Sequence, residues 1–297
     1  MSGFTAIDLS SLTAPDAVEA LDYETILAGM LADLVARDET FTALTESDPA
    51  MKVLEVAAYR ELLLRQRVNE AVRAVLVAFA TGSDLDQLAA LVPLTRLVID
   101  PGDPDADPAV APTYESDAAF RVRVQLAPEA FSSAGSTGAY RYHALTVAAV
   151  LDAVTVSPSP GNVSVYVLAR DGDGTPDDAT LAAVAAVVGA SDVRPLTDNV
   201  TVLSAEIVSY AVEANLVIES GPDAAVVAAA AQDAALAYAA ARHVLGARLA
   251  VSGLVAALHV EGVARVELTS PVGDVVCAKY QAPACTGVSL TAEVADE

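Results

Sequence analysis

The chain has 297 residues, enough for about two domains at roughly 150 residues each. Hydrophobic residues make up 54% of the chain and charged residues 19%, a balance that excludes a wholly disordered protein. Sixteen basic residues against 40 acidic ones give a net charge of −24, and lysine occurs only at Lys52 and Lys279. We therefore exclude nucleic acid and anionic membrane surfaces as main partners, because both are bound through basic residues.

The sequence has no sign of secretion, of a membrane span or of a disulfide framework. The first residues lack the basic segment and apolar core of a signal peptide. The most apolar stretches are too short, or are interrupted by Gln232 and Asp233. Cys277 and Cys285 are too few for a disulfide scaffold or a four-thiolate zinc site. We expect a soluble protein, made inside the cell, in which both thiols are free.

The N-terminal third predicts helices. A first helix covers 22–36. A longer one begins at Pro49, after the capping candidates Ser47 and Asp48, and runs to the stop signal at Thr81 and Gly82. At ~1.5 Å per residue it would measure roughly 50 Å. One face of it is defined by apolar residues at helical spacing: Val53, Ala57, Leu64, Val68, Val75 and Phe79.

This candidate inter-subunit helix face can bind another chain, or it can be buried within its own chain; the sequence leaves both open. On the other face, Glu61 with Arg65 and Glu70 with Arg73 have the spacing of helical ion pairs. A capping box at Ser83 and Asp86 then predicts a short helix over 85–91.

The middle of the chain changes character. Four prolines and four aspartates between Asp100 and Pro112 predict an extended surface linker, because proline fixes φ and donates no hydrogen bond. In the segment from Phe120 to Leu126 the apolar residues alternate as in a strand, whereas Ser116 and Pro128 flank it as helix ends. We favour a helix here.

The remainder predicts alternating helices and strands. Helices are expected at 137–151, from Pro176 to Gly189, at 222–245 and at 252–259. Strands are expected at 154–156, 163–167, 200–203 and 263–268, with an unusually long one over 205–219 that offers an edge for joining modules or subunits. The segments around Ala144–Pro158 and Ala257–Pro271 echo one another, which indicates two related modules.

The predicted fold class is therefore α+β. We expect an N-terminal helical region (1–99), an Asp/Pro-rich linker and connecting segment (100–136), and two small related modules (137–204 and 205–297). In both modules helices pack on mixed or antiparallel sheets.

No motif of a known catalytic class occurs. The phosphate loop, the Gly-x-Ser-x-Gly elbow and the His-Glu-x-x-His pair are all missing, and the three histidines lie far apart. The run Asp171–Asp178 has oxygen ligands at alternate positions that would suit calcium, but the glutamate at the twelfth position is replaced by Ala182. We interpret it as a turn in which Thr175 caps the helix that begins at Pro176. We expect no enzyme activity, no cofactor and no metal; a carboxylate-based cell-wall hydrolase is the remote alternative.

Several motifs resemble, in order, those of the baseplate J-like proteins of contractile phage tails. They are Glu46–Asn69, Ala80–Leu88, Tyr114–Asp117, Gln125–Pro128, Gly138–His143, Gly172–Thr175 and Asp192–Asp198. The resemblance covers nearly the whole chain and points to the P2-like members and their counterparts in R-type bacteriocins. The Asp/Pro-rich insert and the low lysine content depart from the family pattern.

The resemblance implies a structural baseplate wedge subunit of the virion tail, made in the host cytoplasm. In such a wedge two copies join a smaller I-like tail protein, next to the lysozyme-fold wedge protein, the hub and spike, and neighbouring wedges. Rearrangement of the ring would trigger sheath contraction and genome delivery. The alternative is that the chain has the same structural role in an R-type bacteriocin or another contractile injection system. Short connections around Pro195 and Gly221 are candidate hinges for that rearrangement.

Overall fold

The computed structural model describes residues 7, 9–132, 135–221 and 223–294. By its internal contacts the chain forms two compact units. Of the described residues, one unit holds those from Ile7 to Arg96 together with Glu115–Val124, and the other holds Leu97–Tyr114 and those from Gln125 onward. The α+β class is confirmed. The fourfold division made from the sequence remains a prediction.

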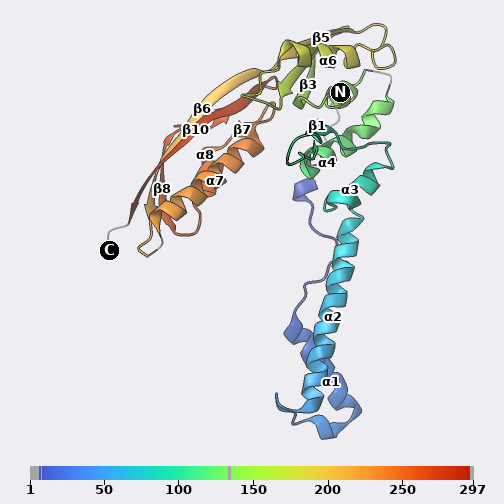
Figure 1. The fold of residues 1–297 in the computed structure, drawn as a ribbon, viewed down its shortest axis with the longest axis vertical. Coiled ribbons are helices and arrows are strands. Elements are labelled where there is room, and N and C mark those ends of the chain that lie inside the picture. Colours follow the sequence, from blue (N-terminus) through green and yellow to red (C-terminus); the bar gives the residue numbers. More distant parts are fainter. Residues whose placement is uncertain (1–6, 8, 133–134, 222, 295–297) are drawn as a thin grey trace. The chain divides into compact units, whose positions relative to one another are not determined.

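The first of these units is helical. Its elements are η1 (Leu9–Ser11), α1 (Tyr23–Arg37), η2 (Glu39–Phe41), α2 (Pro49–Ala74), α3 (Gly82–Ala89) and most of α4 (Asp117–Leu126). The Asp22 carboxylate caps α1 by accepting from the Thr25 N–H (2.9 Å), and Asp48 caps α2 by accepting from the Ala50 N–H (2.9 Å). Helix α1 lies along α2 (Figure 1). The helix predicted over 120–126 is confirmed.

Helix α2 is shorter than predicted. It ends at Ala74, so its 26 residues span roughly 39 Å, and Phe79 lies beyond it in a turn. The cause is a tertiary contact. The Arg121 side chain donates to the carbonyl oxygens of Val77 (2.6 Å) and Ala80 (2.7 Å), which leaves the chain folded in turns rather than in a continued helix.

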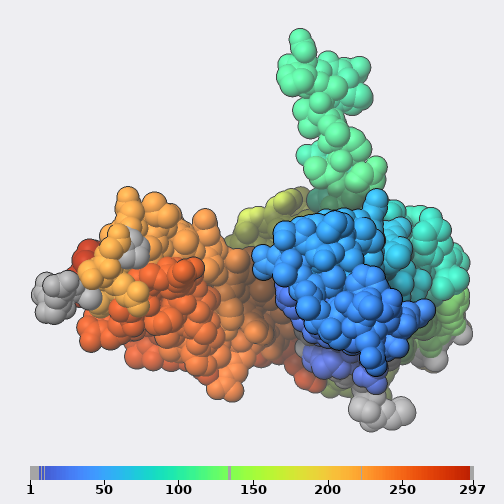
Figure 2. Space-filling model, turned by 90° about the horizontal axis from the view of Figure 1, so that it is seen from below, coloured from blue at the N-terminus to red at the C-terminus, as the bar shows by residue number. Residues whose placement is uncertain are grey.

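The expected linker at 100–112 is a folded arm. Strands β1 (Val98–Asp100) and β2 (Thr113–Tyr114) pair antiparallel, and an isolated bridge joins Asp103 to Val110 farther out. Gly102 has φ +67°, and any side chain there would collide with the Val110 carbonyl. Since the ends of the segment meet, it cannot act as a spacer. Its residues are mostly exposed and project as a narrow green arm in Figure 2.

A first sheet has the order β3-β4-β5. Its strands are β3 (Val150–Ser159), β4 (Asn162–Ala169) and β5 (Asn199–Ser204), covered by α5 (Thr137–Ala144) and α6 (Asp178–Val188) after η3 (Ala127–Phe131). The central strand pairs antiparallel with β3 and parallel with β5. Tyr140, Val165 and Val184 are fully buried between helices and sheet. The predicted helix over 137–151 was wrong in its second half, where turns follow Ala144 and β3 begins at Val150.

A second sheet has the order β10-β6-β8. Its strands are β6 (Glu206–Ile218), β8 (Val263–Ser270) and β10 (Gln281–Val294), with α7 (Ala224–Arg242) and α8 (Val251–Leu258) on one face and the small pair β7 (Arg248–Leu249) and β9 (Val275–Val276) beside them (Figure 1). Strand β6 is central, antiparallel to β8 and parallel to β10. The expectation that this long strand offers an edge was wrong for Glu213–Ile218, where β8 and β10 pair with both edges, whereas Glu206–Val212 pair with β10 and not with β8. Strand β10 was not predicted.

Helix α7 is long and apolar enough to cross a membrane by length and composition alone. In the structure its buried residues Val227, Ala231, Ala235 and Ala239 instead belong to the core of the second sheet. We interpret α7 as a core helix, since one such helix is weak support for a membrane span.

Candidate subunit interface

The N-terminal segment is fastened to one side of α2 by specific hydrogen bonds. The Asn69 side chain, which is buried on this side, accepts from the Glu19 N–H (3.0 Å) and donates to the Glu19 carbonyl (2.9 Å). The Tyr23 hydroxyl donates to the Glu55 carbonyl at 3.4 Å. Ala58 is fully buried on the same side. The chain's own cover on α2 is therefore confined to this side of the helix.

The opposite side of α2 is an exposed apolar face. Val53 is 69% exposed and Leu64 68% exposed. The exposed large apolar residues of α2 and its C-cap are Val53, Val56, Tyr59, Leu63, Leu64, Val68 and Val75. Of the six residues that we predicted for a face, all but Phe79 are exposed, and Phe79 is partly buried outside the helix. A contiguous exposed patch of this kind is typical of a protein-binding surface.

The charged residues of α2 differ in part from the predicted pairs. Arg65 donates to Glu61 (2.6 Å) and also to Glu19 (3.0 Å). Glu70 lies 3.7 Å from Arg67 rather than beside Arg73. The predicted pair of Glu70 with Arg73 is therefore replaced by a pair with the residue one turn toward the N-terminus, which is also a helical neighbour.

A hollow of about 320 Å³ lies where the N-terminal segment meets this face. Its lining combines apolar side chains of α2 with the Arg65 ion-pair group: Glu19, Leu64, Arg65, Arg67, Val68 and Asn69. Leu64 and Val68 thus belong both to the exposed face and to a concave site that can receive a side chain.

Near the C-terminal end of α2, a partly buried arginine, Arg96, holds α3 and α4 together. Arg96 donates to the carboxylates of Asp86 and Asp117, each at 2.6 Å, and its guanidinium lies 4.8 Å from the centre of the Phe120 ring. Hydrogen bonding from Arg96 lowers the pKa of Asp117. Arg123 and Glu115 form a buried ion pair nearby. These contacts are absent from the sequence prediction, since nothing in the local spacing brings Arg96 to Asp117.

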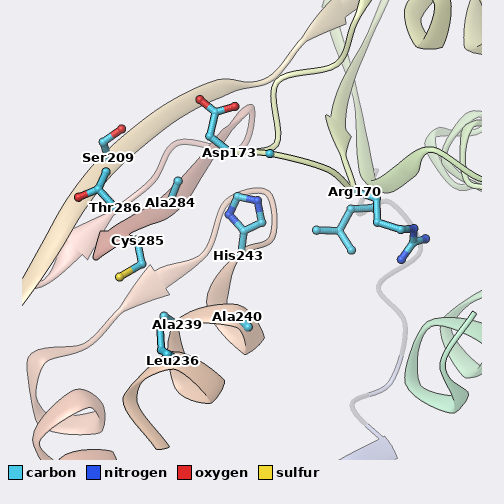
Figure 3. A pocket seen from close by; sticks show the side chains of 12 residues that line it. Arg170, Asp173, Ser209, Leu236, Ala239, Ala240, His243, Ala284, Cys285 and Thr286 are labelled. Atoms are coloured by element: carbon cyan, nitrogen blue, oxygen red, sulfur yellow. The ribbon is translucent and has the colours of Figure 1, made fainter. Parts of the chain in front are cut away.

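The other unit contains a hollow of about 670 Å³ between the two sheets. Figure 3 shows Arg170 and Asp173 entering from the first sheet's side, and His243 and Cys285 from the second's. His243 Nδ1 donates to the Pro283 carbonyl at 2.7 Å, and Arg170 donates to the carbonyls of Ala148 and Val150. Both side chains are thus engaged in holding backbone, a structural role.

A glycine in the Asp171–Asp178 loop lies against this hollow. Gly174 has φ +97°, and a side chain there would lie 2.8 Å from His243 Nε2. The Asp173 carboxylate accepts from the Thr175 N–H (3.0 Å). The helix cap is Asp177, which accepts from the Thr180 N–H (2.7 Å), so the prediction of Thr175 as cap was wrong. Among the described residues no group of three or more His, Cys, Asp or Glu is placed to hold a metal ion.

Asp152 joins the two sheets, and the sequence analysis missed it. The residue is only 7% exposed. One oxygen accepts from the Leu245 N–H (3.1 Å), after α7, and the other from Arg141 (2.9 Å) on α5. The sequence did offer a sign of this role, because Asp152 is a charged residue between the apolar strand residues Leu151 and Ala153. The chain passes from the first sheet to the second at Ala205, whose N–H donates to the Val167 carbonyl (2.9 Å). The candidate hinges around Pro195 and Gly221 do not lie at this connection.

Comparison with known proteins defines the class to which these features belong. Three consecutive family models match the chain: the baseplate J-like N-terminal domain at 46–103, the central domain at 132–204 and the C-terminal domain at 210–291. The chain belongs to the baseplate J-like family. Baseplate protein J of Escherichia phage P2 is 44% identical over 299 residues, an alignment that covers 98% of this chain and 99% of that relative. Membership supports a structural role in a phage tail baseplate.

Proposed function

We propose that this chain is a wedge subunit of a phage tail baseplate, and that the exposed apolar face of α2 is where it binds other wedge chains. The observation that carries the proposal is the face itself. Its own chain covers the opposite side of α2 and leaves Val53 and Leu64 two-thirds exposed. Burial of such side chains stabilises an assembly by ~1.5–3 kcal/mol each, before the costs of association.

The wedge that we propose contains a second copy of the chain and a smaller I-like tail protein. Within the baseplate it would lie near the lysozyme-fold wedge protein, the hub and spike, and neighbouring wedges. We propose further that rearrangement of the wedge ring triggers sheath contraction and genome delivery, and that the same role would serve in an R-type bacteriocin or another contractile injection system. The chain would be made in the host cytoplasm and would have no catalytic role.

The test is co-expression with the neighbouring tail genes, followed by native mass measurement of the complex. We expect the wild-type chain to form a complex of defined composition, and Leu64→Asp to lose it because a carboxylate is placed on the face. Asp105→Ala, on the exposed arm, is the matched control and should assemble normally. A wild-type chain that stays a monomer with all of its tail neighbours, or a Leu64→Asp variant that assembles like wild type, would contradict the proposal.

A further inference from the structure

Strand β6 has no partner along part of one edge. It continues β5 through Ala205, and β4 pairs with this continuous stretch of chain as far as Ser204. Strand β8 joins the same side of the stretch only at Glu213. Between these two ladders, over 207–211, no strand in the described part of the chain pairs with this edge. We call residues 207–211 the ladder gap.

The backbone polar groups of the ladder gap point away from β10. Successive residues of a strand direct their N–H and C=O groups to alternate sides. The Glu206 N–H donates to the Tyr280 carbonyl (3.1 Å), on the side of β10, and the Ala205 N–H donates to β4 (2.9 Å), on the opposite side. By this alternation, the N–H and C=O groups of Ile207 and Ser209 face the ladder gap. Such unpaired groups form a template for a further strand.

Space for an added strand lies beside the ladder gap. Ser209 is one of the residues that line the hollow of about 670 Å³. Figure 3 shows Asp173 and Ser209 at this hollow, together with Ala239 and Ala240 of α7. The volume is in the range of sites that enclose small ligands. The hollow can therefore receive a side chain of a strand that is added at the ladder gap.

The two ends of the ladder gap limit what can enter it. At one end Ala205 is bonded to β4, and at the other the Ser270 hydroxyl, where β8 ends, donates to the Ala211 carbonyl (2.9 Å). At about 3.3 Å per residue, an extended segment of about five residues fits between these ends. The edge strands of the two sheets, β3, β5, β8 and β10, are all longer than this. In a second copy of the chain, they would collide with β4 or β8.

The surroundings of the ladder gap are acidic. Glu206 and Glu213 flank it in β6, Asp173 lines the hollow, and all three are exposed. The side chain of Arg170, which also lines the hollow, is engaged with backbone carbonyls. Opposite charge favours association, so the entering segment should carry Lys or Arg. The arm of a second copy would be repelled, because 98–114 contains four aspartates and no basic residue.

We propose that the ladder gap is a strand-addition site for a short extended segment of a different polypeptide. The segment would exchange backbone hydrogen bonds with Ile207 and Ser209, place an apolar side chain in the hollow against α7, and carry a Lys or Arg that meets Asp173. In this mode of recognition, backbone pairing supplies affinity and alternate side chains supply specificity. The proposal concerns β6 and not α2, and it rests on the proposed function only in placing the partner in the tail baseplate.

Hydrogen exchange of the full chain, alone and in the assembled tail, tests the site. In the isolated chain the amides of Ile207 and Ser209 should exchange faster than those of Glu206 and Val208, which face β10. In the tail we expect both to be slowed at least about tenfold, because an added strand accepts their hydrogen bonds. A chain that joins the tail while these two amides exchange as in isolation would overturn the inference and leave the proposed function intact. A chain that is absent from the tail would overturn both.

A photoreactive residue identifies the partner segment. Benzoylphenylalanine in place of Ser209, in the full chain within the tail, should cross-link to a different polypeptide at an extended stretch that contains Lys or Arg. A cross-link to a second copy of this chain, to a helix, or to a stretch without a basic residue would overturn the inference. The cross-linked stretch, made as a synthetic peptide, is then the probe for binding to the isolated full chain.

Two variants block the site in different ways. Ser209→Pro removes an N–H that no described ladder uses, a position where strands tolerate proline. Ala240→Phe fills the hollow from an exposed position on α7, and Ala237→Phe is its matched control, exposed on the same helix but outside the hollow. We expect Ser209→Pro and Ala240→Phe each to weaken peptide binding at least about tenfold, and Ala237→Phe to leave it within about twofold.

Unfolding temperatures separate a blocked site from a damaged fold. Ala240→Phe and Ala237→Phe should unfold at the same temperature, so that a difference in peptide binding between them reports on the hollow. If Ser209→Pro is unstable, this pair of variants still decides the question. Equal peptide binding by Ala240→Phe and Ala237→Phe would overturn the inference.

Discussion

Removal of the Asp152 carboxylate should loosen the junction between the two sheets. In the structure this buried group accepts from the Leu245 N–H, from Arg141 and from the Ala153 N–H. The Arg141 side chain is 35% exposed and can be rehydrated when its partner is removed, whereas the Leu245 N–H is left without its acceptor. We therefore expect Asp152→Ala to cost about 3 kcal/mol, between one charged hydrogen bond and a fully buried ion pair.

That loss corresponds to a fall of about 9 °C in the unfolding temperature of a unit of this size. Thermal unfolding followed by circular dichroism measures it, and hydrogen exchange with mass analysis of the segment around Leu245 locates it. Asp152→Asn keeps the volume and one acceptor, so it should fall between wild type and Asp152→Ala. Asp105→Ala, on the exposed arm, is the control. If Asp152→Ala has the unfolding temperature of wild type and the segment around Leu245 keeps its protection from hydrogen exchange, Asp152 does not join the sheets.

Three further predictions concern other groups. Arg121→Met should destabilise the helical unit by about 2 kcal/mol in denaturant titration, because the carbonyls of Val77 and Ala80 lose their donors, and an unchanged midpoint would refute that role. Tyr140→Phe should cost about 1 kcal/mol through loss of the hydrogen bond to Asp198 (2.8 Å). Burial, helped by Asp198, raises the pKa of Tyr140, so the stability that the tyrosine adds is present below pH 10 and is lost as the pH rises above it. Unfolding of wild type and variant at pH 8 and pH 11 would show this difference. The pKa of Asp117 is lowered chiefly by Arg96, so the stability that this carboxylate adds is present above the ordinary aspartate pKa of 3.8 and is lost as the pH falls below it. Asp117→Asn should therefore be less stable than wild type at pH 6 and equally stable well below pH 3. A difference in stability that stays constant with pH would contradict the pairing.

Local signals predicted much of the fold. Capping residues and apolar spacing located α1, the start of α2 and most elements after residue 137, because these signals act within a few residues. The end of α2 could not be found in this way, since Arg121 is 44 residues from the carbonyl of Val77. The arm was taken for a linker because proline content does not reveal that Val98 pairs with Tyr114.

The candidate site was predictable to a similar extent. The spacing of Val53, Leu64 and Val68 placed them on one face, which helix geometry fixes. Which face the N-terminal segment would cover depended on Asn69, a polar residue whose partner is the backbone of Glu19, 50 positions away. Asp152 was missed for the same reason, because its partner Leu245 is 93 positions away.

The measurement that tests the central claim most directly is side-chain footprinting of α2 in the isolated chain and in the assembled tail. Hydroxyl radicals label exposed leucine and tyrosine side chains, and Tyr59, Leu63 and Leu64 are exposed in this structure. We predict strong labelling of all three in the isolated chain and strong protection in the tail, with Leu196, which is 99% exposed on a loop, as the internal reference. Equal labelling of α2 in both states would show that no other chain covers this face.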